Sequence, residues 1–429
     1  MTVQLLAGAA EVEITPPVGT PLCGSLAPRT SKGVLDPLMV KALVLESGTT
    51  RLAYAIFDLC VLGRDVGDQA VTRASESTGI PPDHIIWTAS HTHSGPYTTA
   101  LVSQEGVIDH AWLGTLPDAL ARCVAEADAA KVPARVSRVR GYHYGLGHNR
   151  RLQFKDGREI NTWLLNAGEE EVQCLGAAGP IDPEVGALAF ETLDGRMLAV
   201  LFHYALHTNA YFGERLSADY PAVVASRLRE CYGPQTITLF LPGAQADINS
   251  IAPSYRHIGD ALASEIESQL RTRRPTSEPI TLGALKREVT VPYRDCTVDQ
   301  TARIQASQWS PESQETFHRE LEIMRQAGVT ETKTILQTWR VSNVGFASLP
   351  GELFVQWGMK IKRESPFPWT YPVELGGDYL GYLVTQQAWE AGGYESLIAR
   401  SAKPSIEGVG MMVDTALDML HELYRGDIP

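Results

Sequence analysis

The sequence predicts an α/β protein, built as a layered structure with mixed β-sheets and flanking helices, and two observations support this fold class. Short apolar runs rich in β-branched residues alternate with longer stretches that have helical spacing. Strands that alternate with helices in this way are typical of layered α/β cores. The composition agrees, because 44% of the 429 residues are hydrophobic and 20% are charged, whereas a disordered chain has far fewer apolar residues.

The expected elements follow from the spacing of their apolar residues. Residues 40–46 and 51–59 form two adjacent strands joined by a Ser-Gly-Thr turn. A continuous or alternating apolar run marks a strand, whereas apolar residues at every third or fourth position mark a helix. On this basis we expect helices at 67–78, 112–129, 220–230 and 258–270, and strands at 84–89, 136–144, 196–204 and 236–241.

The least regular segment is 275–336, which contains a strand-like stretch at 285–293 and a charged helical stretch at 311–327. No Gly-, Ser- or Pro-rich connector flanks this segment, so we interpret it as an excursion within one catalytic domain that spans residues 1–429. An amphipathic helix at 408–423 closes the chain, and we therefore expect no separate C-terminal module.

The charge excludes some classes of partner. The chain has 37 Lys and Arg against 50 Asp and Glu, a net charge of −13, and nucleic-acid binding needs clustered basic residues. No run approaches the roughly 18 apolar residues that span a bilayer, and the first residues lack the features of a signal peptide. Six scattered cysteines without a CxxC pair suit free thiols in a reducing compartment. We expect a cytoplasmic protein, no nucleic-acid partner and a soluble substrate.

The clearest chemical motif is Ser-His-Thr-His-Ser-Gly-Pro at 90–96, directly after the buried strand at 84–89. If extended geometry persists through the motif, His91 and His93 project to the same side. Two neutral imidazoles on one side can share a zinc ion. The alternative is that one or both histidines only cap the turn.

A second histidine follows the strand at 196–204. His203 lies inside the apolar run and is expected to be a core residue, whereas His207 comes where the run gives way to polar residues and is the better ligand candidate. Downstream, Ser217 or Asp219 is expected to cap the following helix.

Two strands end in the same Leu-Pro-Gly sequence, at 241–243 and 349–351, and each is followed by a carboxylate, Asp247 and Glu352 respectively. Glu352 could be a first-turn acid that the helix dipole favours. Because the chain also has two candidate metal histidines, we favour the interpretation that Glu352 is an oxygen ligand of a hydrolytic zinc site.

Taken in order, these segments resemble the neutral/alkaline non-lysosomal ceramidase family, in particular the catalytic domain of its shorter bacterial members. The matching segments are 7–17, 91–96, 149–150, 207, 217–221, 243–249, 350–352 and 382–394. The resemblance implies one zinc ion and hydrolysis of an amide (N-acyl) bond in a small or amphiphilic substrate. It implies the zinc ligands His91, His207, Glu352 and Tyr382. It also implies that His93, Arg150 and Tyr394 surround the scissile bond.

One position departs from the family. Larger ceramidases have a serine that is needed for activity where this chain has Asn249, and extended geometry would turn the adjacent Ser250 the other way. An amide side chain cannot be a nucleophile, so we expect direct attack by water. Asp247 could orient a ligand histidine or accept a proton. We also expect no immunoglobulin-like C-terminal domain of the kind that larger ceramidases have.

Other functions stay open at this point. A zinc hydrolase of the same fold could act on an ester, a lactam or a glycosidic bond, because a fold does not fix its substrate. An amidohydrolase barrel also has a His-x-His strand end, but there it normally lies on the first strand. A zinc-containing binding protein that has lost catalysis is the remaining alternative, and the missing serine is its support.

Overall fold

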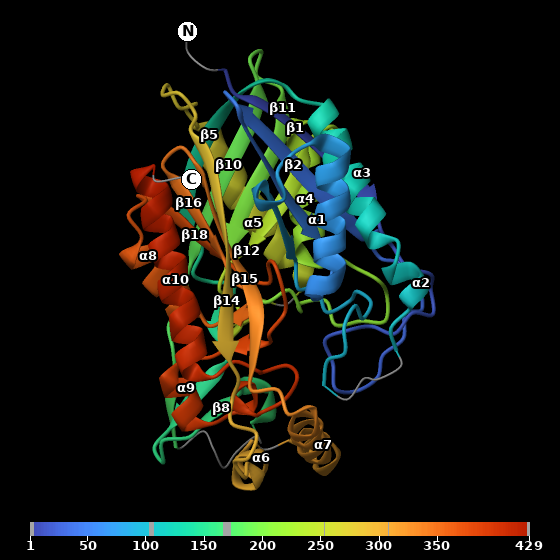
Figure 1. Cartoon of the computed structure of the whole chain (residues 1–429), viewed down its shortest axis with the longest axis vertical. Helices are drawn as coiled ribbons and strands as arrows, with labels where there is room; N and C mark the ends of the chain where they lie inside the picture. Colours follow the sequence, from blue (N-terminus) through green and yellow to red (C-terminus); the bar gives the residue numbers. More distant parts are fainter. Residues whose placement is uncertain (1–3, 103–106, 166–172, 253, 308, 427–429) are drawn as a thin grey trace.

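The computed structural model describes residues 4–102, 107–165, 173–252, 254–307 and 309–426, and its main layer is an eight-stranded sheet (Figure 1). The strand order is β12-β11-β10-β5-β1-β2-β3-β4. The bounds are β1 Leu6–Glu13, β2 Met39–Ser47, β3 Thr50–Phe57, β4 Ile85–Ala89, β5 Val132–Tyr142, β10 Glu184–Thr192, β11 Met197–Tyr204 and β12 Ile237–Pro242. The pairs β3–β4 and β11–β12 are parallel and the others are antiparallel, which confirms the mixed α/β class.

The eight-stranded sheet curls so that distant strands meet across the core. The hydroxyl of Tyr54 on β3 donates a hydrogen bond of 2.8 Å to the carbonyl oxygen of Phe240 on β12. Large sheets twist and curl in this way, because each strand has a right-handed twist. The carboxyl ends of β4 and β11, which lie near opposite edges of the sheet, therefore approach each other.

A second, four-stranded sheet packs against the first in the order β14-β15-β16-β18. Its strands are β14 (Leu282–Pro292), β15 (Glu331–Val341), β16 (Val344–Ser348) and β18 (Trp369–Val373). The segment after β18 links the two sheets, since Glu374 N donates to Pro242 O at 3.1 Å and Ala89 N donates to Leu375 O at 3.2 Å. The carboxyl ends of β4, β12 and β18 thus meet in one region.

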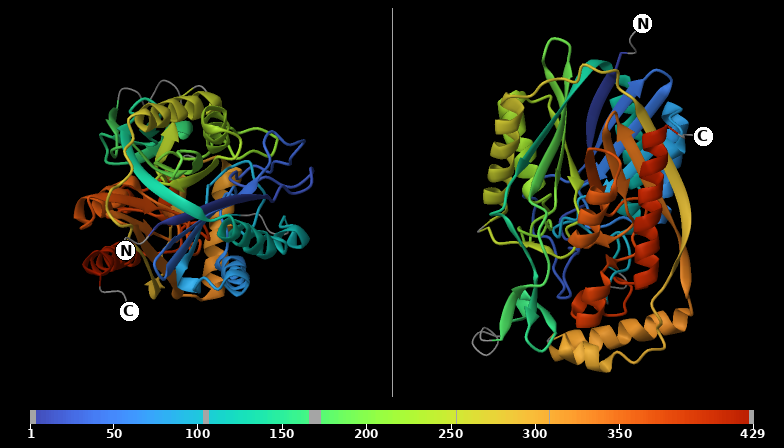
Figure 2. Two further views of the ribbon diagram at one scale, coloured as in Figure 1. Left: turned by 90° about the horizontal axis from the view of Figure 1, so that it is seen from above. Right: turned by 90° about the vertical axis from the view of Figure 1, so that its left-hand side faces the viewer.

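Helices cover the outer faces of both sheets. α1 (Arg64–Thr78) and α3 (Leu116–Ala129) pack on β1, β2 and β4, while α4 (Tyr220–Tyr232) and α5 (Tyr255–Arg271) pack on β5, β10 and β12. α8 (Val355–Glu364) and α10 (Ile406–Arg425) cover the four-stranded sheet. Figure 2 shows α4 and α5 on the opposite side of the molecule from α10.

The remaining elements complete the fold. They are α2 (His110–Leu113), α6 (Thr301–Ala306), α7 (Pro311–Ala327), α9 (Gln386–Ala391), β6 (Gly147–Asn149), β7 (Arg151–Phe154), β8 (Glu159–Asn161), β9 (Cys174–Ala177), β13 (Ile248–Ser250), β17 (Glu352–Leu353) and β19 (Tyr382–Leu383), with 3-10 turns at Pro82–His84, Thr162–Leu164 and Tyr394–Ser396. β6 pairs with β13 and β17 pairs with β19. α6 and α7 lie at the lower end of the molecule in Figure 1.

Most predicted elements are present, with three kinds of difference. The helix expected at 112–129 is two helices, α2 and α3, because Pro117 in a continuous helix would remove a hydrogen bond and clash with the preceding turn. The strands β1 and β10 were not predicted, since Ala and Gly weaken their strand pattern. The segment 275–336 contributes β14 and most of β15 to the four-stranded sheet, with α6 and α7 between them.

Several smaller predictions can also be compared with the structure. Asp219 caps α4, as expected, by accepting a hydrogen bond from Tyr220 N. All six cysteines are free. Within the described residues, none of the helices is both long and apolar enough to cross a bilayer. A single domain over residues 1–429 and a cytoplasmic location stay predictions.

Candidate active site

A cavity of about 680 Å³ lies where the strand ends meet. Its wall is rich in aromatic rings, namely Tyr97, Trp163, Phe212, Trp309, Tyr379, Tyr382 and Tyr394. Its polar and ionisable wall residues include His91, His93, Arg150, His207, Asn249 and Glu352. Carboxyl ends of strands are the usual position of ligand sites in α/β proteins.

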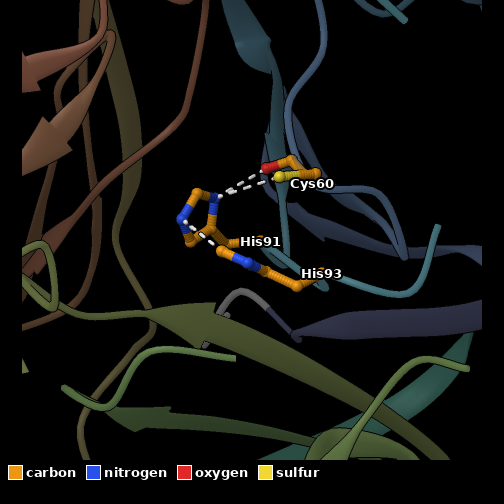
Figure 3. A group of neighbouring side chains, drawn as sticks. All are labelled: Cys60, His91 and His93. Carbon is orange, nitrogen blue, oxygen red and sulfur yellow. Dashed lines mark hydrogen bonds between the residues drawn. The ribbon is translucent and has the colours of Figure 1, made fainter. Parts of the chain in front are cut away.

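The His-x-His segment reaches the cavity by a different backbone path from the one expected. His91 has a φ of +67°, in the left-handed region, so extended geometry does not persist through the motif. The chain turns at His91, and this turn brings the two rings edge to face, with centroids 4.9 Å apart. The Nε2 atoms of His91 and His93 lie 3.4 Å apart (Figure 3). Strained backbone of this kind persists where the surrounding structure over-determines it.

His207 completes a cluster of three imidazoles. It follows β11, and its Nε2 atom lies 3.0 Å from that of His91 and 3.0 Å from that of His93. Burial lowers the pKa of His207 well below its ordinary value, and His91 adds to the effect. Burial and His91 likewise lower the pKa of His93. Both rings are therefore neutral at pH 7.

Backbone carbonyls fix the orientation of all three rings. Each Nδ1 faces a carbonyl oxygen: that of Cys60 at 2.9 Å for His91, that of Gly24 at 2.8 Å for His93, and that of Gln245 at 3.3 Å for His207. A carbonyl can only accept a hydrogen bond, so Nδ1 carries a proton in each ring, and in the neutral rings of His93 and His207 Nε2 keeps its lone pair. A metal-binding histidine is commonly held by such a contact.

Glu352 supplies a carboxylate beside the imidazoles. It lies on β17, and its Oε1 accepts a hydrogen bond of 2.8 Å from the Tyr379 hydroxyl. Its Oε2 lies 3.3 Å from His91 Nε2 and has no hydrogen-bond partner among the described residues. Burial raises the pKa of Glu352, but His91 and Arg150 outweigh burial and hold it below its ordinary value.

These groups fit a divalent cation. Ligand atoms of His91, His207 and Glu352 all lie within 4.8 Å of one another. The buried carboxylate oxygen of Glu352 has no hydrogen-bond partner and lies next to imidazole nitrogens. Burying these polar atoms costs folding free energy unless a cation lies between them. Nitrogen and carboxylate donors in a small cluster are typical of zinc.

A second group lies beside the cluster of His91, His207 and Glu352. Arg150 is buried, its Nε and Nη2 each lie 2.9 Å from Glu395 Oε1, and its Nη2 also donates to the Tyr382 hydroxyl at 3.2 Å. The hydroxyls of Tyr382 and Tyr394 are hydrogen-bonded to each other. Nη1 of Arg150 lies 3.4 Å from Asn249 Oδ1. Burial raises the pKa of both tyrosines above their ordinary value, so both phenols keep their protons at neutral pH.

No protein-family model matches the sequence. Solved structures do match: neutral ceramidase from Pseudomonas aeruginosa has a TM-score of 0.76 at 16% sequence identity, with 100% of this chain and 75% of that chain covered. The chain has the neutral ceramidase fold. A structure of a ceramidase complexed with C2 gives a TM-score of 0.75 at 16% identity, with 100% and 76% covered. The fold implied by the order of the motifs is confirmed.

Within this ceramidase fold, the side chain of Asp247 contacts Asn149 and Val355, whereas the sequence suggested that it could orient a ligand histidine or accept a proton. Its Oδ2 accepts a hydrogen bond of 2.7 Å from the Asn149 side chain, and its Oδ1 accepts one of 2.8 Å from Val355 N. Its backbone carbonyl accepts from Arg150 N at 2.7 Å. Burial raises the pKa of Asp247 to about 6. The carboxylate therefore holds the turn that carries Arg150, whereas the carbonyl of Gln245 orients His207.

Sequence reasoning gave no role to several residues of the site. Tyr379 binds Glu352, and Glu395 binds both Arg150 and Arg151. The need for Glu395 follows from the burial of Arg150 and Arg151, because a buried arginine pair needs a carboxylate partner, and the sequence does not show that burial. No local pattern distinguishes Tyr379 from a core tyrosine. Ser250, expected to turn away, also borders the cavity, and its hydroxyl accepts a hydrogen bond from Ala252 N at 3.0 Å.

Proposed function

We propose that this protein is a zinc-dependent hydrolase that cleaves an amide (N-acyl) bond of a small or amphiphilic substrate. The observation that carries the proposal is the convergence of ligand atoms from His91, His207 and Glu352 at one wall of the cavity. The neutral ceramidase fold adds support, because the name ceramidase denotes cleavage of an N-acyl lipid.

The zinc site would be held by His91, His207 and Glu352, with Tyr382 as the further ligand that the family resemblance implies. When bound, zinc polarises a carbonyl group and lowers the pKa of water to about 7, so that hydrolysis proceeds at neutral pH. The protein's own contribution is orientation. The carbonyls of Cys60 and Gln245 hold the two rings, and Tyr379 holds the carboxylate of Glu352.

Arg150 and Tyr394 are suited to the negative charge that develops on the scissile carbonyl oxygen. Arg150 keeps its charge, and Tyr394 keeps the proton of its phenol, so both can donate hydrogen bonds. A well-placed donor of this kind is worth about 3–4 kcal/mol in other acyl-transfer enzymes. Asn249 has no nucleophilic atom, and water is therefore the attacking group in this proposal.

The cavity supports a substrate with an apolar portion. A volume of about 680 Å³ lies within the range of small-molecule sites, which is about 300–1,000 Å³. Trp163 and Trp309 flank Tyr394, with ring centroids 6.3 and 5.7 Å from it. An acyl chain or an aromatic acyl group would pack on these rings while the amide faces His91.

A substrate panel tests this proposal. N-acyl amides, the matching esters, lactams and glycosides are assayed before chelation, after chelation, and after zinc is restored. We expect amide cleavage that is lost with the metal and regained with zinc. Cleavage of only esters, lactams or glycosides would overturn the choice of bond, and zinc binding without any turnover would favour a binding protein.

A further inference from the structure

Glu374 is a buried acid to which the proposed function gives no role. It directly follows β18 and is 0% exposed. Its Oε2 accepts hydrogen bonds from two backbone N–H groups, that of Leu353 at 2.9 Å and that of Gln245 at 3.3 Å. Removing a carboxyl group from water costs folding free energy, so these two contacts are the place to look for its role.

Both N–H groups belong to turns that carry the candidate zinc ligands. Leu353 directly follows Glu352 on β17. Gln245 lies in the turn after β12, and its carbonyl oxygen orients the ring of His207. The first turn follows β16 and the second follows β12, and these strands lie in different sheets. A single oxygen atom of Glu374 therefore joins the residue next to one ligand to the residue that orients another.

Backbone hydrogen bonds hold Glu374 at this junction. Its own N–H donates to the carbonyl oxygen of Pro242 at 3.1 Å, and Leu375 N donates to the carbonyl oxygen of Gly351 at 3.2 Å. The segment after β18 is thus tied to both Leu-Pro-Gly turns, at 241–243 and 349–351. Because the backbone is held independently of the side chain, replacing the side chain should remove the two contacts at Oε2 and leave the strand pairing in place.

We propose that Glu374 is a positioning residue of the zinc site, which sets the separation of His207 and Glu352 by binding the two turns that carry them. This inference rests on the proposed function. Glu374 is not among the described residues that line the cavity, so we assign it no contact with the substrate.

The role requires a hydrogen-bond acceptor and no charge. Burial raises the pKa of Glu374 well above its ordinary value, and the neighbouring Glu352 adds to the effect. The oxygen of a side-chain amide can accept the same two hydrogen bonds as a neutral carboxyl group. Glu374→Gln should therefore keep the arrangement of the two turns. Glu374→Leu has a similar size but no acceptor, and it leaves two N–H groups unpaired.

Zinc affinity of these two variants tests the proposal. It is measured for the metal-free proteins by competition with a chromophoric chelator. Loss of a residue that supports metal ligands typically lowers metal affinity about 10–100-fold, and we expect this loss for Glu374→Leu. Glu374→Gln should stay within about threefold of wild type, since it keeps the acceptor. Wild-type affinity in Glu374→Leu, or an equal loss in both variants, would overturn the proposal.

Glu191→Leu is the matched control for general loss of stability. The side chain of Glu191 is 8% exposed and accepts a hydrogen bond of 2.7 Å from Arg273. Glu191 pairs with Met197, the first residue of β11, whereas His207 follows the other end of that strand. The control should unfold at a lower urea concentration than wild type and keep its zinc affinity. If it lost as much zinc affinity as Glu374→Leu, the effect would be general and the proposal would be overturned.

Glu374→Asp keeps the proposal testable if Glu374→Leu does not fold. An aspartate is one methylene shorter and cannot reach both N–H groups, so zinc affinity should fall about tenfold. Unchanged affinity would overturn the role of Glu374. A wild type that binds zinc together with unaffected variants would refute this role alone, whereas a wild type that binds no zinc would refute the proposed function as well. Thermal unfolding of the metal-free proteins verifies that each variant is folded.

Discussion

Glu395 offers a sharp test of how Arg150, which lines the cavity, is held. Its side chain is fully buried, Oε1 lies 2.9 Å from Arg150 Nε, and Oε2 lies 2.6 Å from Arg151 Nη1. Arg151 has a second carboxylate, Glu159, at 2.8 Å, but Glu395 is the carboxylate partner of Arg150 among the described ion pairs. Glu395→Gln keeps the shape of the side chain and leaves the Arg150 charge buried without compensation.

The expected loss follows from the burial of both partners. Side-chain exposure is 2% for Arg150 and 0% for Glu395, so solvent screens this pair very little. Removing one partner of a buried ion pair typically costs about 3–5 kcal/mol of the free energy of unfolding. Because Arg150 also contacts Tyr382, kcat should fall by about 100-fold, the effect of one misplaced oxyanion donor.

Urea unfolding followed by circular dichroism measures this loss. The control is Asp118→Asn, which breaks the Arg73–Asp118 pair, whose side chains are 42% and 74% exposed. An exposed pair contributes less than about 1 kcal/mol, so the control should unfold nearly as wild type does. A Glu395→Gln protein as stable as the control would refute the reasoning that Arg150 depends on this carboxylate.

The remaining predictions concern acid sensitivity and substrate contact. Burial lowers the pKa of His203 to about 3. Between pH 6.5 and 3 the unfolded state therefore binds a proton at His203 that the folded state does not bind. The free energy of unfolding falls as the pH falls through this range. Between pH 7 and 4.5 the metal-free wild type should lose about 2–3 kcal/mol more of its free energy of unfolding than His203→Phe; equal losses in urea titrations would contradict this. Tyr394→Phe should lower kcat about 100-fold with KM nearly unchanged, because the phenol donates mainly to the developing oxyanion. A rise in KM alone would instead assign Tyr394 to ground-state binding.

The fold class and the segments that reach the cavity could be predicted from the sequence, because each leaves a local pattern in it. A buried strand followed by polar residues and a turn marks a strand end, and ligand sites lie at such ends. His91, His207 and Glu352 all follow such ends, and their side chains lie together in the structure.

The arrangement within the site left no local signal. The His91 backbone lies at φ +67°, which brings His93 to the cluster by a turn that extended geometry does not anticipate. The curl of the eight-stranded sheet, seen in the contact of Tyr54 with Phe240, depends on residues 186 positions apart. The strands β1 and β10 contain small residues, which weaken the sequence pattern of a strand. Their pairing is decided by their neighbours in the sheet, which the local sequence does not show.

Metal dependence of amide cleavage tests the central claim most directly. Zinc content and turnover of an N-acyl amide are measured for the wild type as purified, after chelation, and after zinc is restored, beside the His91→Ala/His207→Ala double variant. The account predicts one zinc per chain, activity that disappears and returns with it, and neither zinc nor turnover in the double variant. A folded, metal-free double variant that still cleaves the amide would contradict it.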